Sequence, residues 1–92
     1  EDAQFRNYLT SEGYHYVTDN LMLHLYISEV NKSYFTFLKE AGYGNLPKEE
    51  LEHLVHHRVR EEKLRKYLTS FKQLNLNQPK MSELVQLVVQ LI

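Results

Sequence analysis

The chain has 92 residues, a formal net charge of −1 and no cysteine. This length limits it to one small domain, residues 1–92, and the lack of cysteine excludes disulfides and thiolate metal sites and leaves the compartment open. No apolar run reaches the roughly 18–20 residues of a membrane-spanning helix. Aromatic residues are frequent and Gly and Pro are few, which is typical of a folded helical domain.

One apolar pattern occurs three times, in units of residues 5–30, 34–59 and 64–92. Equivalent positions recur at a nearly constant step along the chain. The aligned columns are Tyr8, Phe37, Tyr67; Leu9, Leu38, Leu68; Val17, Leu46, Leu76; Leu25, Leu54, Leu84; and Val30, Val59, Val89. The pair Gly13 and Tyr14 recurs as Gly42 and Tyr43, but not in the third copy. A fixed period of this size indicates stacked helix-pair units.

The first copy predicts two helices separated by a glycine stop. Asp2 can cap a helix that runs to about Glu12, with its apolar residues at helical spacing. Gly13 is suited to end this helix because glycine adopts the left-handed conformation without a Cβ penalty. Thr18 or Asp19 can cap the next helix, about Asp19–Ser28.

The central copy, the clearest of the three, predicts helices over Lys32–Ala41 and Pro47–His57. Gly42 should end the first of them. Pro47 stands at a first helical position, where its missing N–H is no loss. Leu46 should anchor the intervening link in the core, since it belongs to one of the apolar columns.

The third copy predicts helices over Glu61–Phe71 and Pro79–Gln90. A strand is the alternative for the valine-rich end, but the repeat register favours a helix. This last helix is apolar over more than half of its circumference, so it should be buried or paired. A further copy or a partner chain is therefore expected to cover it. The residues expected to meet that partner are Met81, Leu84, Leu87, Val88, Leu91 and Ile92.

These elements predict an all-α protein of about six short helices in three pairs, as a small solenoid or compact bundle. The central copy reads YxxxLxxAGYxxLxxxELxxLxxxxV from Tyr34 to Val59. It resembles short tandem helical repeats of bacterial regulatory proteins, especially those that follow the peptidase part of BlaR-like antibiotic sensors. That family usually carries Gly before the Val, where this chain has Glu29 and Arg58. The resemblance implies a non-catalytic interaction or sensing module, and the peptidase motif HExxH is absent from the sequence.

Three histidines lie close together in the central copy. His53 and His57 are four residues apart on one helix face and could share a Zn²⁺ ion, with His56 beside them. The sequence fixes no third ligand, so a solvated polar face is the favoured interpretation. We predict no metal and no other cofactor.

Charge is unevenly distributed along the chain. Residues 1–57 hold four basic and nine acidic residues (4 − 9 = −5), and residues 58–92 hold seven and three (7 − 3 = +4). The basic side chains that could contact nucleic acid are Arg58, Arg60, Lys63, Arg65, Lys66 and Lys72. Tyr67 and Phe71 interleave with them and could stack on bases, but both also fall at core spacing.

The sequence leaves two functions open. The favoured one is a protein-interaction module, which could associate with itself through the last helix and through its acidic and basic ends. Tyr16 and Tyr26 lie outside the repeat columns and are the tyrosines expected to be exposed contacts. The alternative is a small nucleic-acid-binding domain that uses residues 58–72. No nucleophile and base are arranged for catalysis, so we predict that the protein is not an enzyme.

Overall fold

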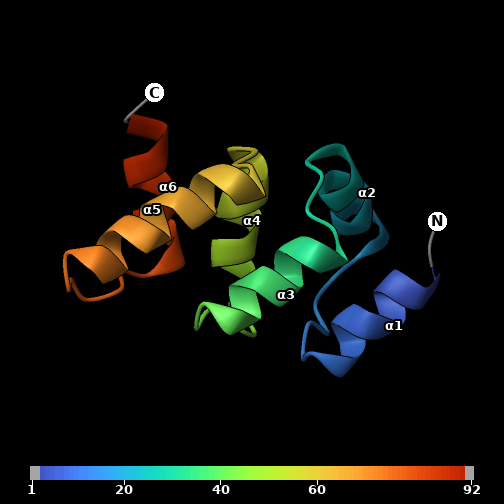
Figure 1. Ribbon diagram of the computed structural model, residues 1–92. Coiled ribbons are helices and arrows are strands. Elements are labelled where there is room, and N and C mark those ends of the chain that lie inside the picture. The colour runs from blue at the N-terminus through green and yellow to red at the C-terminus, as the bar shows by residue number, and fades with distance from the viewer. Residues whose placement is uncertain (1–2, 91–92) are drawn as a thin grey trace.

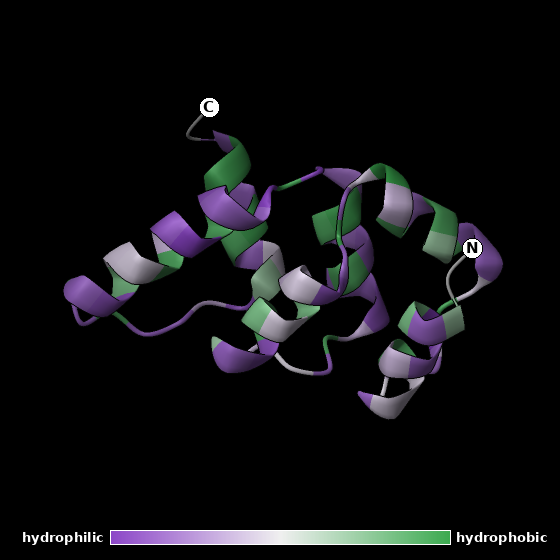
Figure 2. Cartoon of the chain, turned by 45° about the vertical axis from the view of Figure 1, so that its right-hand side comes forward, coloured by the Kyte–Doolittle hydropathy of each residue, from purple (hydrophilic) through white to green (hydrophobic). Residues whose placement is uncertain are grey.

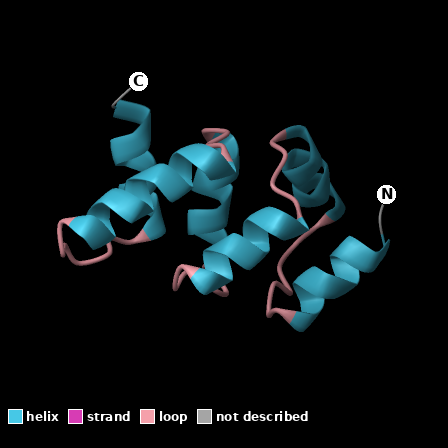
Figure 3. Ribbon diagram, viewed as in Figure 1, coloured by secondary structure: helices cyan, strands magenta, loops and turns pink. Residues whose placement is uncertain are grey.

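Six helices make up most of residues 3–90, the part of the chain that the computed structural model describes (Figure 1). They are α1 (Ala3–Ser11), α2 (Asp19–Ile27), α3 (Lys32–Glu40), α4 (Lys48–His56), α5 (Glu61–Gln73) and α6 (Met81–Gln90). No strand occurs among these described residues (Figure 3), so the predicted all-α class is confirmed. The alternative of a C-terminal strand is wrong for residues 81–90, which form α6.

The helices lie in two rows along a molecule of 40 × 24 × 20 Å (Figure 1). One row holds α1, α3 and α5, and the other holds α2, α4 and α6. Within the second row α4 lies between α2 and α6, and α6 packs against both α4 and α5. The N-terminal pair and the C-terminal pair therefore form opposite ends of the molecule.

Gly13 and Gly42 end α1 and α3 as predicted. Their φ angles are +95° and +93°, in the region that L-residues with a Cβ rarely adopt. The following amides close each helix, because Tyr14 N–H donates to Leu9 C=O and Tyr43 N–H donates to Leu38 C=O. This is the 6→1 hydrogen bond of a Schellman cap.

Two further turns use a left-handed residue that is not glycine. Glu29 has a φ of 59° and Arg58 has a φ of 51°. Each directly precedes a buried valine, Val30 or Val59, at the place where the resembled repeats usually carry glycine. The backbone of these turns thus has a conformation that glycine adopts at lower cost.

The third copy departs from the predicted register because it has no glycine where α1 and α3 end. As a result α5 continues to Gln73, and the left-handed residue is Asn75, with a φ of 58°. The step from Gly42 to Asn75 is longer than the step from Gly13 to Gly42 by about one helical turn. Three predicted columns are therefore wrong in this copy. Leu76 is 54% exposed, whereas Leu46 is 4% exposed, and Val89 lies inside α6 and not in a link. Leu84 is buried, but its counterpart in α4 is Leu51 and not Leu54, because α4 begins after Pro47 and α6 begins after Lys80.

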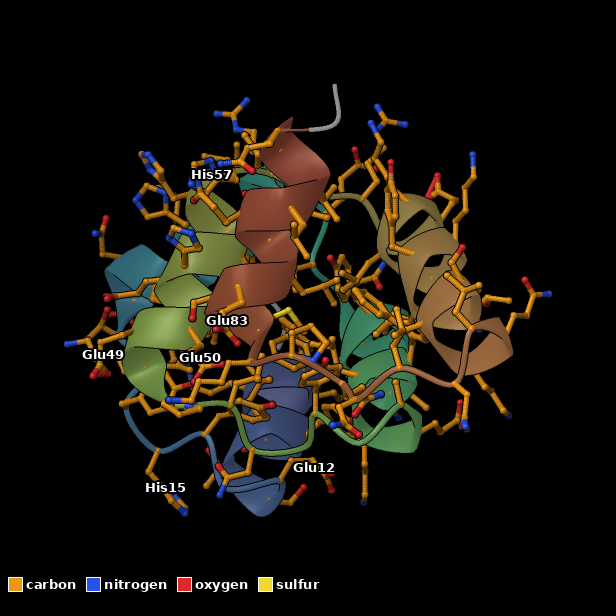
Figure 4. The ribbon with its side chains drawn as sticks, turned by 90° about the vertical axis from the view of Figure 1, so that its left-hand side faces the viewer. Glu12, His15, Glu49, Glu50, His57 and Glu83 are labelled. Atoms are coloured by element: carbon orange, nitrogen blue, oxygen red, sulfur yellow. The ribbon has the colours of Figure 1, made fainter. Side chains whose placement is uncertain are left out.

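The start of α6 is fixed by two glutamates (Figure 4). Glu83 Oε1 accepts a hydrogen bond from Lys80 N–H at 3.0 Å, which is half of a capping box. Glu50 Oε1, from α4, accepts from Met81 N–H, also at 3.0 Å. Together they satisfy two amides at the helix start and hold α6 in register with α4.

All six helices contribute to one apolar core. The largest side chains with almost no exposed surface are Leu9, Met22, Leu25, Tyr34, Leu38, Leu51, Leu54, Leu64, Met81 and Leu84. Among the described residues no buried polar side-chain atom lacks a hydrogen-bond partner. The core therefore joins all three helix pairs, as expected for stacked repeats.

Tyrosine hydroxyls link neighbouring segments through backbone groups. Tyr34 Oη donates to Val59 C=O at 2.7 Å, and Tyr43 Oη donates to Pro79 C=O at 2.7 Å. Tyr14 Oη accepts from the amide of the link before α4, and Tyr16 Oη donates to the carbonyl of the same residue at 2.7 Å. The prediction that Tyr16 is an exposed contact is therefore wrong, because it is half-buried and bonded within the chain.

Alanine at Gly42 should lower the free energy of unfolding by roughly 1–3 kcal/mol, because the left-handed backbone would then carry a Cβ. That Cβ would also come within 3.2 Å of Gln78 Oε1. Gly44→Ala is the matched control, since its Cβ would make only ordinary contact, at 3.6 Å from Lys39 Cγ. Urea unfolding followed by circular dichroism measures both changes, and equal costs would contradict the structural role given to Gly42.

Candidate interaction surface

The helices of the second row can be compared residue by residue. The first helical hydrogen bonds are accepted by the carbonyls of Thr18, Pro47 and Lys80, which are therefore equivalent positions. Counting along each helix from these three positions pairs every residue of α2 with a counterpart in α4 and another in α6. This register allows the same position to be followed from one end of the molecule to the other.

One side of each of these helices faces the preceding pair. In α4 this side includes Val55, whose carbonyl accepts from Ser28 Oγ at the end of α2 at 3.2 Å. Val55 also lines a groove of about 290 Å³ shared by α2 and α4. Its counterparts are Tyr26 in α2 and Val88 in α6, and the exposed fractions of Tyr26, Val55 and Val88 are 45%, 5% and 1%. Tyr26 is partly exposed because, among the described residues, no helix of the second row precedes α2.

We call Leu23, Tyr26 and Ile27 the N-terminal apolar surface. Leu23 is 55% exposed and Ile27 is 52% exposed, while the Tyr26 ring packs on Phe5 with its centroid 6.2 Å away. Beside them lies a groove of about 410 Å³, which Phe5 and Val30 help to line. Large apolar side chains and a groove therefore occur together at this end.

The opposite side of each helix faces the following pair. Leu25 and Leu54 are equivalent and fully buried, whereas their counterpart in α6, Leu87, is 42% exposed. Leu76 is the counterpart of the buried Tyr14 and Tyr43, since its amide closes α5 by donating to the Phe71 carbonyl. We call Leu76 and Leu87 the C-terminal apolar surface, because both are exposed whereas their counterparts in the other two units are buried.

Three of the four described interaction residues predicted in the last helix are not available to a partner. Met81, Leu84 and Val88 are buried in the core of this chain, since α4 and α5 pack on the apolar side of α6. Figure 2 shows α6 mostly green, and the buried residues of this helix are Met81, Leu84, Val85 and Val88. The expected covering by another chain is therefore wrong for the three predicted residues Met81, Leu84 and Val88. Leu87 is exposed, and Leu91 and Ile92 lie outside the described residues.

All the basic residues predicted to contact nucleic acid are exposed; they are Arg58, Arg60, Lys63, Arg65, Lys66 and Lys72. Arg65, however, is paired with Glu61 at 2.8 Å, and its guanidinium lies 4.3 Å from the centre of the Phe37 ring. The interleaved Tyr67 and Phe71 are half-buried and pack against the core. Their rings are thus used mainly for packing, which leaves less surface for stacking on bases.

The histidine cluster lies at the C-terminal end of α4, where Figure 4 shows His57. The ring centres of His53 and His57 are 4.6 Å apart, and those of His56 and His57 are 5.1 Å apart. The pKa of His57 is lowered, first by desolvation and then by the neighbouring His53 and His56. Among the described residues no group of three potential ligands is arranged to hold a metal ion.

The exposure of Leu23 and Ile27 was not predicted from the sequence, although a signal was present. The stretch Leu21–Ile27 is apolar apart from His24, so its apolar residues cover more than one side of a helix. The equivalent positions in α4 are Glu52 and His56, which suit an exposed surface. Comparing the copies at these two positions would have identified the N-terminal apolar surface.

A search for related proteins, made against protein-family models, curated proteins and solved structures, finds no match to this chain. The chain is therefore classified from its own structure alone, as a small all-α protein whose helices lie in two rows. In residues 3–90 no helix has both the length and the apolar character needed to cross a membrane.

Proposed function

We propose that this chain is a non-catalytic protein-interaction module that binds protein partners through the apolar side chains at its ends. The observation that carries the proposal is the exposure of Tyr26, at a position whose counterparts Val55 and Val88 are buried. Leu23 and Ile27 enlarge the same surface. A helix of a partner lying against α2 would complete the packing that α4 and α6 already have.

Physical chemistry favours the covering of this surface. Complete burial of a leucine or isoleucine contributes roughly 1.5–3 kcal/mol, and two such residues here are about half exposed. Clustered exposed apolar residues on a small protein are a common feature of protein interaction sites. The groove beside them could also accept an apolar side chain from the partner.

Nucleic-acid binding is the second candidate, supported by the exposure of its six basic side chains. It is the weaker one, because Arg65 is paired with Glu61, and Glu62 lies on the same helix. The acidic residues 1–57, which carry −5, would also repel phosphates. Binding of this kind would weaken steeply as salt is added.

Site-specific photo-crosslinking in cells tests the two candidates together. A photoreactive residue at position 27 should form adducts with protein, while one at position 36, an exposed threonine of the central copy, should form few. A photoreactive residue at position 66 tests the basic segment. Protein adducts at position 27 would support the proposal. Adducts confined to nucleic acid at position 66 would overturn it in favour of the alternative.

A further inference from the structure

The two apolar surfaces are the two halves of one repeating contact. Inside the chain, Leu54 of α4 and Val88 of α6 are both buried, and these two helices pack against each other. Within residues 3–90, Leu87 has the position of Leu54 but no following pair packs on it, and it is 42% exposed. Tyr26 has the position of Val88, but no second-row helix within the same residues precedes α2, and Tyr26 is 45% exposed. Each end thus exposes an apolar side chain whose counterpart inside the chain is buried, so the two ends could pack against each other as α4 and α6 do.

We infer that copies of this chain associate head to tail, with α6 of one copy packed against α2 of the next. This inference rests on the proposed function and names the partner as a second copy. The junction would continue the series α2, α4, α6 in the same register. Leu87 would then lie against Leu23 and Tyr26 of the next copy. It would be covered there, as its counterpart Leu54 is covered within the chain.

The loop before α6 adds a second contact to this junction. Inside the chain, Tyr14 and Tyr43 each reach the link that precedes the next helix of the second row, through Leu46 N–H and Pro79 C=O. Leu76 is their counterpart at the C-terminal end and is exposed. In the assembly it would lie beside the link before α2 of the next copy, which includes Val17.

Charge complementarity favours a second copy over an unrelated protein. The described residues of the N-terminal pair (3–30) include one basic and three acidic residues (1 − 3 = −2), and those of the C-terminal pair (61–90) include five basic and three acidic residues (5 − 3 = +2). A head-to-tail arrangement brings these opposite charges together, whereas a head-to-head dimer would bring like charges together. A head-to-tail contact between two different surfaces does not close on itself unless a ring forms, so open chains of copies are expected.

Sedimentation velocity on purified protein at increasing concentration tests the inference. The wild-type chain should form species that grow beyond a dimer, also at high salt, because the contact is mainly apolar. Ile27→Lys and Leu87→Lys should each remain monomeric with unchanged helix content. Thr36→Lys adds the same charge to an exposed position of the central copy and should assemble like the wild type.

Mixing the two monomeric variants gives the decisive result. Ile27→Lys keeps its C-terminal surface and Leu87→Lys keeps its N-terminal surface, so the mixture should form a dimer with one copy of each and nothing larger. A wild-type chain that stays monomeric at every concentration would overturn the inference, as would assembly that survives in Leu87→Lys. If the chain is monomeric but position 27 still crosslinks to another protein, only the head-to-tail inference fails. If neither occurs, the proposed function fails as well.

Discussion

Replacing Leu54 by alanine should lower the free energy of unfolding by roughly 2–5 kcal/mol, whereas the same change at Leu87 should cost less than about 1 kcal/mol. The two leucines occupy the same position of the repeat, in α4 and in α6. Leu54 has no exposed surface, so the alanine leaves a cavity in addition to the lost apolar burial. Leu87 is 42% exposed, so water fills the space that its side chain leaves.

The loss at Leu54 would be large relative to the whole stability of the protein. Small domains are stabilised by roughly 5–15 kcal/mol in total. Urea unfolding followed by circular dichroism, at concentrations low enough to exclude association, measures both variants. Similar costs at the two positions would contradict the register that makes Leu87 the uncovered counterpart of Leu54.

Raising the pH above about 10, the ordinary pKa of tyrosine, should unfold the protein steeply. Burial raises the pKa of four tyrosines, which are Tyr14, Tyr16, Tyr34 and Tyr43. Below pH 10 these phenols are protonated in both the folded and the unfolded state, so their contribution to stability is fully present. Above it the unfolded chain releases protons that the folded chain retains, and stability falls as the pH rises through the folded-state pKa values.

Ionisation would also break the contacts that these hydroxyls make. Tyr16, Tyr34 and Tyr43 all donate to backbone carbonyls, which a phenolate cannot do. Tyrosinate absorbance and helical circular dichroism, recorded in one pH titration, should therefore change together. Complete ionisation with an unchanged helix signal would show that these phenols do not contribute to stability.

Tyr34→Phe is the informative variant for this titration. It leaves the Val59 carbonyl without its donor, which should cost roughly 1–3 kcal/mol at neutral pH. It also removes one of the four ionisations, so stability should fall less steeply above pH 10. Tyr26→Phe changes an exposed tyrosine, leaves all four buried phenols in place and should keep the steep wild-type dependence.

Local physical chemistry made much of the fold predictable. Helix positions followed from apolar spacing, and the ends of α1 and α3 followed from Gly13 and Gly42, whose left-handed backbone disfavours residues with a Cβ. Leu46 was correctly placed in the core. These features depend on residues that are close together in the sequence, so the sequence alone was sufficient to find them.

The candidate surface was less predictable, because exposure depends on what packs against each helix. The repeat pattern assigned Leu76 to the core, but without a glycine stop α5 gains a turn and carries Leu76 to the exposed end. The apolar composition of the last helix predicted an interaction surface there, but Met81, Leu84 and Val88 are buried, because α6 packs against α4 and α5.

The sequence by itself determined the helical class, the threefold pattern and the glycine stops, because these follow from local backbone preferences and apolar periodicity. Only the tertiary structure decided which leucines are covered. Leu25, Leu54 and Leu87 are the same residue in the same position of equivalent helices, yet two are buried and one is exposed. The difference comes from the neighbouring helix pair, which the first two have and the third lacks within residues 3–90.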